Sequence, residues 1–193
     1  MKLKSLIAIV ALPLLLLSCG GGFYMLKNES RPEIKADPHK ATIVIYRATP
    51  FNSSVTIDNF IDNTFIGQTQ GKSYFITKVN PGSHYLVGAS ENNACAKITV
   101  EAGKVYYILQ EVFQGVLQEM FIGARIARTG FSGKTPDDFA KDQKDLTYFS
   151  ILADAIEFPT MKEVEYEETC ADFDKEAAED PERHKDMVNL QGF

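Results

Sequence analysis

Tryptophan is absent from the 193 residues, and only three histidines and three cysteines are present. The net charge is −6, so the chain lacks the positive excess that drives binding to nucleic-acid phosphates. We therefore expect no nucleic-acid partner. Gly and Pro number only 13 and 8, which excludes a collagen-like or generally disordered chain. Hydrophobic residues make up 45%, enough for one domain with an ordinary core.

Motifs that carry chemistry are also missing. His39, His84 and His184 do not have the spacing of zinc ligands. Ser83 precedes His84, but neighbours in a strand point to opposite faces, so the two cannot act as nucleophile and base. No GxSxG, Walker, GxGxxG or HExxH motif occurs. The sequence thus predicts no catalytic, cofactor-binding or metal-binding residues, and a protein that is not an enzyme.

The one long hydrophobic run stands at the N-terminus and is too short to span a membrane. Lys2 and Lys4 precede it, and residues 6–17 are apolar throughout. Twelve residues in a helix reach about 18 Å, against a hydrocarbon core of about 30 Å. A positive region followed by a short apolar one is typical of a secretory signal.

Cys19 directly follows this run, in the sequence Leu16-Leu17-Ser18-Cys19. These residues resemble the lipobox of bacterial lipoproteins, in which the cysteine is acylated with palmitate-type chains and the chain is cut just before it. The resemblance implies a lipoprotein signal peptide over residues 1–18 and a membrane anchor on Cys19, where two or more acyl chains suffice for stable anchoring. Gly20 in place of Asp favours the outer membrane. A plain secretory signal followed by a chance cysteine is the alternative.

Cys95 and Cys170 remain when Cys19 is set aside. An even pair in an oxidising compartment predicts a disulfide, which would tie the C-terminal segment to the rest of the domain. Two separate thiols are the alternative. No CxxC motif occurs, so thiol-redox chemistry is not indicated.

β-type segments begin at residue 41, after a Gly- and Pro-containing stretch over residues 19–40 that reads as a flexible tether. Turn signals at Asp62-Asn63, at Asn80-Pro81-Gly82 and over residues 101–104 separate them. Regular spacing of short strands and turns indicates an antiparallel sandwich. The expected strands cover residues 42–47, 55–57, 60–61, 64–66, 73–79, 84–89, 94–100 and 105–113.

Three of these segments carry a family resemblance: residues 41–47 (ATIVIYR), the Pro81-Gly82 turn, and residues 102–107 (AGKVYY). Together they resemble a bacterial lipoprotein family whose domain is of unknown function and is similar to PEGA-type surface modules. The resemblance covers residues 41–113. It implies a mainly β fold, a small Ig-like or PEGA-like sandwich, and it brings no catalytic residues.

The rest of the chain predicts a short α-helical extension. Residues 114–160 are expected to pack on the sandwich, with a strand over 120–128, a helix from Thr135 to about Leu146, and an ambiguous segment over 147–152. Thr135 as cap and Pro at the first helical position are typical of a helix start. Residues 161–193 hold eleven acidic and four basic residues. They form an acidic C-terminal tail, either a solvated helix or partly disordered.

Several polar and aromatic residues have structural expectations. Asp58 and Asp62 are expected in turns. Tyr106 and Tyr107 alternate faces, so one should enter the core and the other should lie outside. Arg47 and Glu111 are guessed to form an ion pair at a strand end, and His84 to be a surface residue.

Three hypotheses for function follow. The first is a non-catalytic binding or scaffolding module, held at the envelope by the lipid on Cys19 and contacting another envelope protein or peptidoglycan. The second is a carbohydrate-binding module for cell-wall glycan, which requires a row of exposed coplanar tyrosines. The third is a cell-wall hydrolase using carboxylates such as Asp154 and Glu157, which requires a deep cleft with paired acids of raised pKa.

Overall fold

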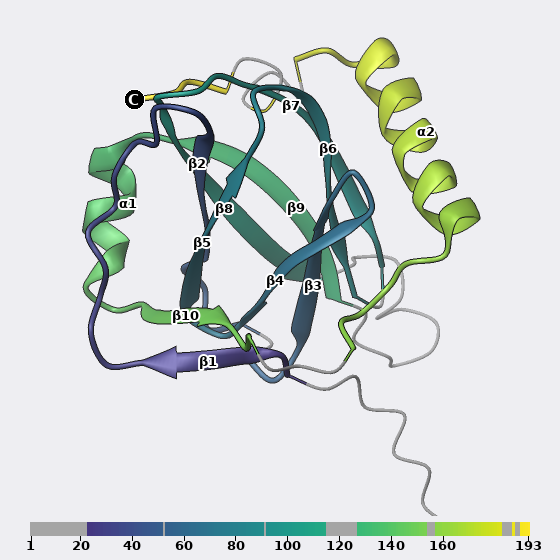
Figure 1. The fold of residues 1–193 in the computed structure, drawn as a ribbon. Coiled ribbons are helices and arrows are strands. Elements are labelled where there is room, and N and C mark those ends of the chain that lie inside the picture. Colours follow the sequence, from purple (N-terminus) through teal and green to yellow (C-terminus); the bar gives the residue numbers. More distant parts are fainter. Residues whose placement is uncertain are drawn as a thin grey trace, which may run out of the picture.

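The computed structural model describes residues 23–51, 53–90, 92–114, 127–153, 157–182, 187 and 190–193. Within them, ten strands form two stacked sheets, and two helices lie against the sheets (Figure 1). One sheet has six strands in the order β1-β10-β5-β2-β8-β9, and the other has four in the order β4-β3-β6-β7. The predicted small, mainly β sandwich is confirmed. The strands are β1 Met25–Asn28, β2 Ala41–Arg47, β3 Thr56–Ile61, β4 Thr64–Gln70, β5 Ser73–Val79, β6 Gly82–Ala89, β7 Ala94–Val100, β8 Val105–Gln114, β9 Ala127–Lys134 and β10 Thr147–Ile151, and the helices are α1 Pro136–Gln143 and α2 Glu163–Glu179.

Strand β2 is the centre of the larger sheet, and all seven of its residues are buried. Ile43 and Ile45 face the space between the sheets, whereas Val44 and Tyr46 face the opposite way, toward α1. The strand pairs antiparallel with β5 but parallel with β8. The sequence suggested antiparallel pairing throughout. Strands β2 and β8 are not joined by a hairpin, because strands β3 to β7 lie between them in the chain and form the crossover that a parallel pair requires.

The β3–β4 hairpin has the predicted two-residue turn. Asp62 and Asn63 adopt φ angles of 48° and 59°, and Ile61 pairs with Thr64 across the turn. A turn of this geometry matches the twist of the flanking strands, and Asp and Asn tolerate its backbone.

A buried polar chain crosses the core between the two sheets. Gln110 on β8 donates from Nε2 to Asn59 Oδ1 on β3 at 2.8 Å, and it accepts a hydrogen bond from the Thr69 hydroxyl on β4. All three residues are fully buried. A side chain at Gly88 would bring its Cβ within 2.8 Å of Gln110 Nε2, so the glycine makes room for the network. Buried polar groups that are satisfied in this way fix the relative position of the sheets.

Helix α1 covers the outer face of the six-stranded sheet. Thr135 caps the helix and Pro stands at its start, as predicted, and Asp138 completes a capping box with Thr135. Phe139 inserts into the aromatic face below. Tyr107 therefore does not lie outside, as its strand position suggested: Tyr106 is buried between the sheets and Tyr107 is buried beneath the helix.

Strand β9 lies partly beyond the segment in which a strand was expected. The expectation covered residues 120–128, most of which lie outside the described residues, and β9 runs over Ala127–Lys134. The ambiguous segment after α1 is a strand, β10, which pairs parallel with β5 and antiparallel with β1.

Strand β1 lies inside the stretch expected to be a flexible tether. Met25 is buried in the main core, and the Phe23 ring meets Phe149 edge to face at 5.3 Å. These apolar contacts explain why the described part of residues 19–40 adds a strand to the sheet. At the other end of the chain, Phe193 pairs its backbone with Val105 at the start of β8.

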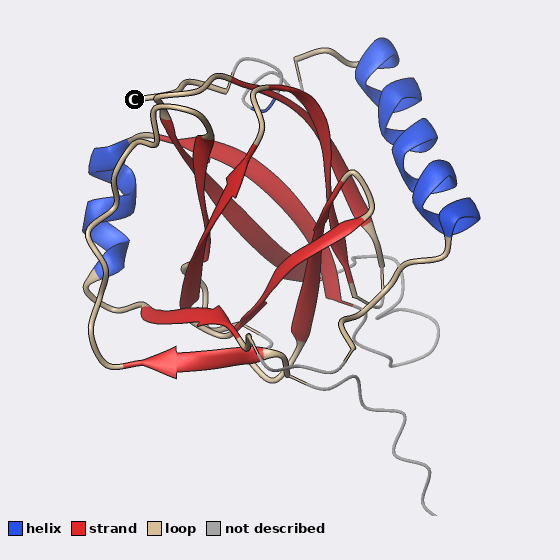
Figure 2. Ribbon diagram, viewed as in Figure 1, coloured by secondary structure: helices blue, strands red, loops and turns tan. Residues whose placement is uncertain are grey.

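Helix α2 lies on the opposite side of the sandwich from α1 (Figure 2). The acidic tail therefore contains a helix, which was one of the two alternatives expected from the sequence. This helix buries Cys170 and Phe173. No helix of the described residues combines the length and apolar character needed to cross a bilayer.

Candidate functional site

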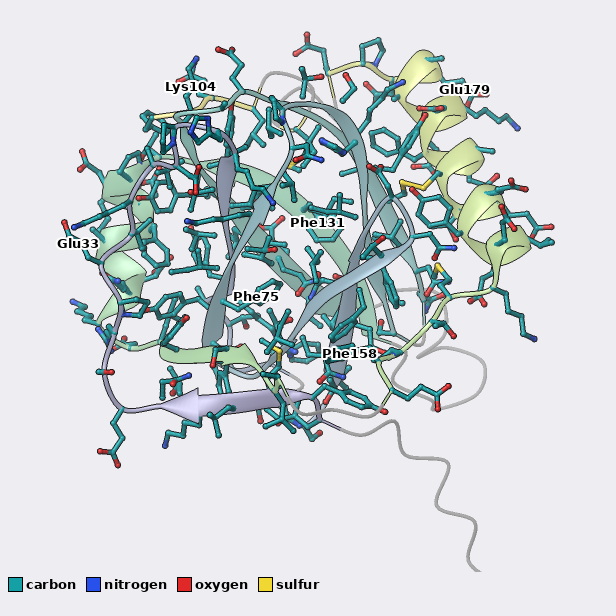
Figure 3. All side chains as sticks on the ribbon, in the orientation of Figure 1. Glu33, Phe75, Lys104, Phe131, Phe158 and Glu179 are labelled. Atoms are coloured by element: carbon teal, nitrogen blue, oxygen red, sulfur yellow. A yellow bond between two sulfur atoms is a disulfide. The ribbon has the colours of Figure 1, made fainter. Side chains whose placement is uncertain are left out.

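The attachment of α2 to the four-stranded sheet defines the candidate site. Cys95 on β7 and Cys170 on α2 lie at disulfide distance, with Cα atoms 5.3 Å apart across 75 positions of sequence. Figure 3 draws the sulfur–sulfur bond between the sheet and the helix. The geometry thus meets the predicted pairing, and the C-terminal segment is tied to the sandwich.

Two polar contacts flank the disulfide. The Tyr85 hydroxyl on β6 donates to Asp174 Oδ2 at 2.6 Å, and this hydrogen bond raises the pKa of Tyr85. Asn93 Nδ2, in the turn between β6 and β7, donates to Glu165 Oε1 at 2.8 Å. The helix is therefore held to the sheet by a polar contact on either side of Cys170.

A hollow of about 310 Å³ lies between this sheet and the N-terminal end of α2. Strands β3 and β4, the β6–β7 turn and the segment that leads into the helix all contribute to its walls. Polar side chains predominate, and the apolar ones include Phe60 and Met161. The lining residues are Thr56, Asp58, Phe60, Gln68, Ala89, Ser90, Asn93, Thr160, Met161 and Glu165.

Asp58 is the half-buried acid of the hollow. Burial raises its pKa, while a hydrogen bond from Gln68 Nε2 at 2.6 Å acts in the opposite direction. Gln68 is buried, and its Oε1 accepts from the Tyr24 backbone N–H. The Tyr24 N–H thus fixes the Gln68 amide, and the amide in turn fixes the Asp58 carboxyl group. The remaining oxygen of this carboxyl group can form a hydrogen bond to a group that enters the hollow.

The expectation that Asp58 lies in a turn is wrong. It occupies the middle of β3, opposite Gln68 on β4. The β3–β4 hairpin is longer than the short segments 55–57 and 60–61 suggested, because the polar pair Asp58 and Asn59 continues the strand between two apolar halves. Asp62, by contrast, lies in the hairpin turn as expected.

His84 has both ring nitrogens engaged. Nδ1 lies 2.5 Å from Asp62 Oδ2, and Nε2 lies 2.8 Å from the Asn80 carbonyl oxygen. Ser83 pairs its hydroxyl with Thr99 at 2.9 Å. The His84 contacts connect the turn before β6 to the β3–β4 turn. Ser83 and His84 have different hydrogen-bond partners and do not bond to each other in these contacts.

Arg47 ends β2 and is fully buried. Its guanidinium donates to the Val55 carbonyl oxygen at 2.9 Å and to that of Phe51. These bonds hold the loop between β2 and β3, a role for the guanidinium that charge alone did not suggest.

The remaining expected site residues fall in different places. Cys19, Asp154 and His184 lie outside the described residues. Glu157 is exposed. Within the described part of the chain, no group of three or more His, Cys, Asp or Glu side chains is arranged to hold a metal ion.

Sequence reasoning missed Gln68 and Glu165, which complete the hollow. Gln68 follows Gly67, whose φ of 141° marks the same strand irregularity that shifts the register between Asn59 and Phe60. That glycine was the available signal. No local sequence signal indicated Glu165, because it meets Asn93 only where residues far apart in the sequence come together at the Cys95–Cys170 pair.

Fold and site together define a two-sheet β module with a small polar hollow beside a disulfide-linked helix. Residues 37–124, a little under half of the chain, match the family model described as a protein of unknown function (DUF2846). The match covers strands β2 to β8, and with them Asp58, Gln68 and Cys95, but neither helix. No curated protein and no solved structure matches the chain.

Proposed function

We propose that this protein is a lipoprotein of the bacterial cell envelope, anchored through Cys19, whose sandwich is a non-catalytic binding or scaffolding module. The outer membrane is the expected location, with the module facing the periplasm or the cell surface. The observation that carries the proposal is the Cys95–Cys170 pair, at a Cα separation of 5.3 Å. Structural disulfides persist in oxidising compartments outside the cytoplasm.

The same pairing singles out Cys19. Of three cysteines, the two within the folded domain are matched to each other. The third stands where the N-terminal apolar run stops, in the lipobox-like sequence. An extracytoplasmic domain and an acylated N-terminal cysteine support one another, because both require export.

The polar chemistry of the domain favours binding over catalysis. His84 has partners on both ring nitrogens, and Asp58 is the acid of the hollow whose pKa burial raises. A glycosidase needs two carboxyl groups at a defined spacing across a cleft, one of them of raised pKa. The second carboxyl group of the hollow, that of Glu165, is exposed and accepts a hydrogen bond from Asn93. Both acids thus serve as hydrogen-bond partners on a fixed scaffold, which suits recognition of a polar group on a protein or a glycan.

Metabolic labelling with a palmitate analogue tests the anchor. The parent chain should incorporate label and sediment with membranes, and Cys19→Ala should do neither. Cys170→Ser is the matched control, because it removes a cysteine and leaves the lipobox intact, so it should remain labelled. Equal labelling of Cys19→Ala, or a soluble mature protein that retains Cys19, would contradict the proposal.

Site-specific crosslinking in intact cells tests the binding surface. A photoreactive residue is placed at Thr160, which is exposed at the hollow, and in a matched chain at Glu101, which is exposed in the β7–β8 turn. A protein adduct at position 160 and none at position 101 is the expected result. A glycan adduct at position 160 would favour the carbohydrate-binding alternative, and turnover of purified peptidoglycan would favour the hydrolase.

A further inference from the structure

Exposed apolar side chains gather on, and directly beside, the two neighbouring strands β1 and β10 at one edge of the larger sheet. Phe23, Leu26, Ile151 and Leu152 are 37%, 53%, 38% and 39% exposed. They are four of the six large hydrophobic residues that the described part of the chain exposes. We call these four residues the β1–β10 patch.

The pairing of β1 with β10 brings the four residues of the patch close together. Met25 lies opposite Ile151, and Leu26 lies opposite Ser150. The Leu152 N–H donates to the Tyr24 carbonyl oxygen at 2.9 Å, which extends the ladder by one step. Neighbouring residues of a strand point to opposite faces, so the patch presents apolar groups on both faces of this edge.

The patch lies at one end of the molecule. Figure 1 shows β1 and β10 along the base of the sandwich, with the C-terminus at the opposite end. Strand β1 is the outermost strand of its sheet. Helices α1 and α2 flank the sandwich and leave this base uncovered.

The proposed anchor is joined to the chain immediately before this base. Four residue steps separate Cys19 from Phe23, so the Cα atoms of the two residues are at most about 14 Å apart, given an extended reach of about 3.5 Å per residue. The headgroup region of a leaflet is roughly 5–8 Å thick. A chain acylated at Cys19 therefore keeps the start of the folded chain within roughly 10 Å of the headgroups.

We propose that the β1–β10 patch rests in the headgroup region of the membrane and sets the orientation of the anchored domain. This inference rests on the proposed lipidation of Cys19. Amphipathic surfaces bury apolar side chains to about 5–10 Å at the boundary between headgroups and acyl chains. Lys27, exposed beside Leu26, can reach lipid phosphates with its amine while its stem packs on the patch. The hollow beside α2 then lies to one side of the anchored base.

The absence of Trp provides a direct test. Leu26→Trp places a single fluorophore in the patch, and Glu179→Trp places one at the far end of α2, which Figure 3 shows away from β1. Each full-length lipoprotein is reconstituted into phosphatidylethanolamine–phosphatidylglycerol vesicles with brominated acyl chains, which quench tryptophan at short range. Flotation of the vesicles reports anchoring separately from quenching.

The expected result is that both variants float and that emission from Leu26→Trp falls by roughly half, as expected for a side chain at this depth, whereas Glu179→Trp is unchanged. Leu152→Trp should behave like Leu26→Trp, and it replaces that variant if the substitution at position 26 prevents folding. Flotation without quenching at positions 26 and 152, or equal quenching at position 179, would overturn the orientation and leave lipidation standing. Failure to float would overturn the lipid anchor, and the inference with it.

Discussion

The two helices cover opposite sides of the sandwich and are held there by different means. Phe139 of α1 is 3% exposed, and its ring lies 5.1, 5.4 and 5.2 Å from those of Tyr46, Tyr74 and Tyr107. Helix α2 also inserts a buried ring, Phe173, into the main core, but it has in addition the Cys95–Cys170 bond and polar contacts at the surface. One attachment depends on apolar burial, which is independent of the redox state. The other depends in addition on a disulfide, which persists in an oxidising environment.

The helix sequences reflect this difference. Helix α1 has a capping box and Pro in its first turn, both of which favour an independent start. Helix α2 begins after Lys162 without a side-chain cap and has no basic residue in its last turn. Most of its charges are negative, and like charges three or four positions apart repel one another. The second helix therefore depends more on its attachment to the sheet.

Truncation of the aromatic contact should have the largest effect. Phe139→Ala removes a ring that three tyrosines surround, and large-to-small changes of this kind cost about 3–5 kcal/mol. The free energy of unfolding from urea titration measures it. Val164→Ala on α2, at a position 65% exposed, should change that free energy by less than about 0.5 kcal/mol. Similar losses for both variants would refute the proposed role of the aromatic contact.

Removal of the disulfide should have the next largest effect. The Cys95→Ser/Cys170→Ser double variant should lose roughly 2–4 kcal/mol, because the bond closes a long loop. Amide hydrogen exchange should become faster over residues 163–179 and remain unchanged over residues 136–143. Exchange that rises equally in both helices would show that the bond supports the whole fold and not α2 in particular.

Loss of the α1 cap should cost less. Thr135→Ala removes the hydroxyl that accepts from the Asp138 N–H at 3.2 Å, and such losses amount to about 1 kcal/mol. Thermal unfolding measures the change, with Thr135→Ser as the control that retains a hydroxyl. If the serine variant loses as much stability as the alanine variant, the cap is not what stabilises this end of α1.

Local patterns predicted the parts of this fold that local chemistry determines. The Asp62-Asn63 turn and the Thr135 cap both followed from residues within a few positions of each other. The burial of Tyr107 and the presence of the hollow could not be predicted in this way, because each depends on a helix from a later part of the chain that packs against the sheets. Strand β1 was missed for the same reason: its partner, β10, is more than a hundred residues away.

The smallest expected difference between the α1 side and the α2 side is in the pH dependence of stability, which should have opposite signs for Asp138 and Asp58. Near α1, hydrogen bonds from Thr135 and then Lys141 lower the pKa of Asp138 to about 2. Its stabilising effect is present above the unfolded pKa of 3.8 and is lost as the pH falls toward 2. Near α2, burial raises the pKa of Asp58. The folded state then binds the proton more tightly than the unfolded state, so stability falls as the pH rises above 3.8.

Asp138→Asn should therefore destabilise the protein at pH 6 and have little effect near pH 2. Asp58→Asn should stabilise it at pH 6, because the substitution removes the cost of a buried charge and leaves an acceptor for Gln68, and this gain should vanish below pH 3.8. Urea titrations of both variants and the parent between pH 2 and pH 7 measure the two differences. Curves of the same sign would mean that the Asp58 carboxylate is better solvated than its place beneath α2 implies, and that α2 does not close over the hollow as α1 closes over its tyrosines.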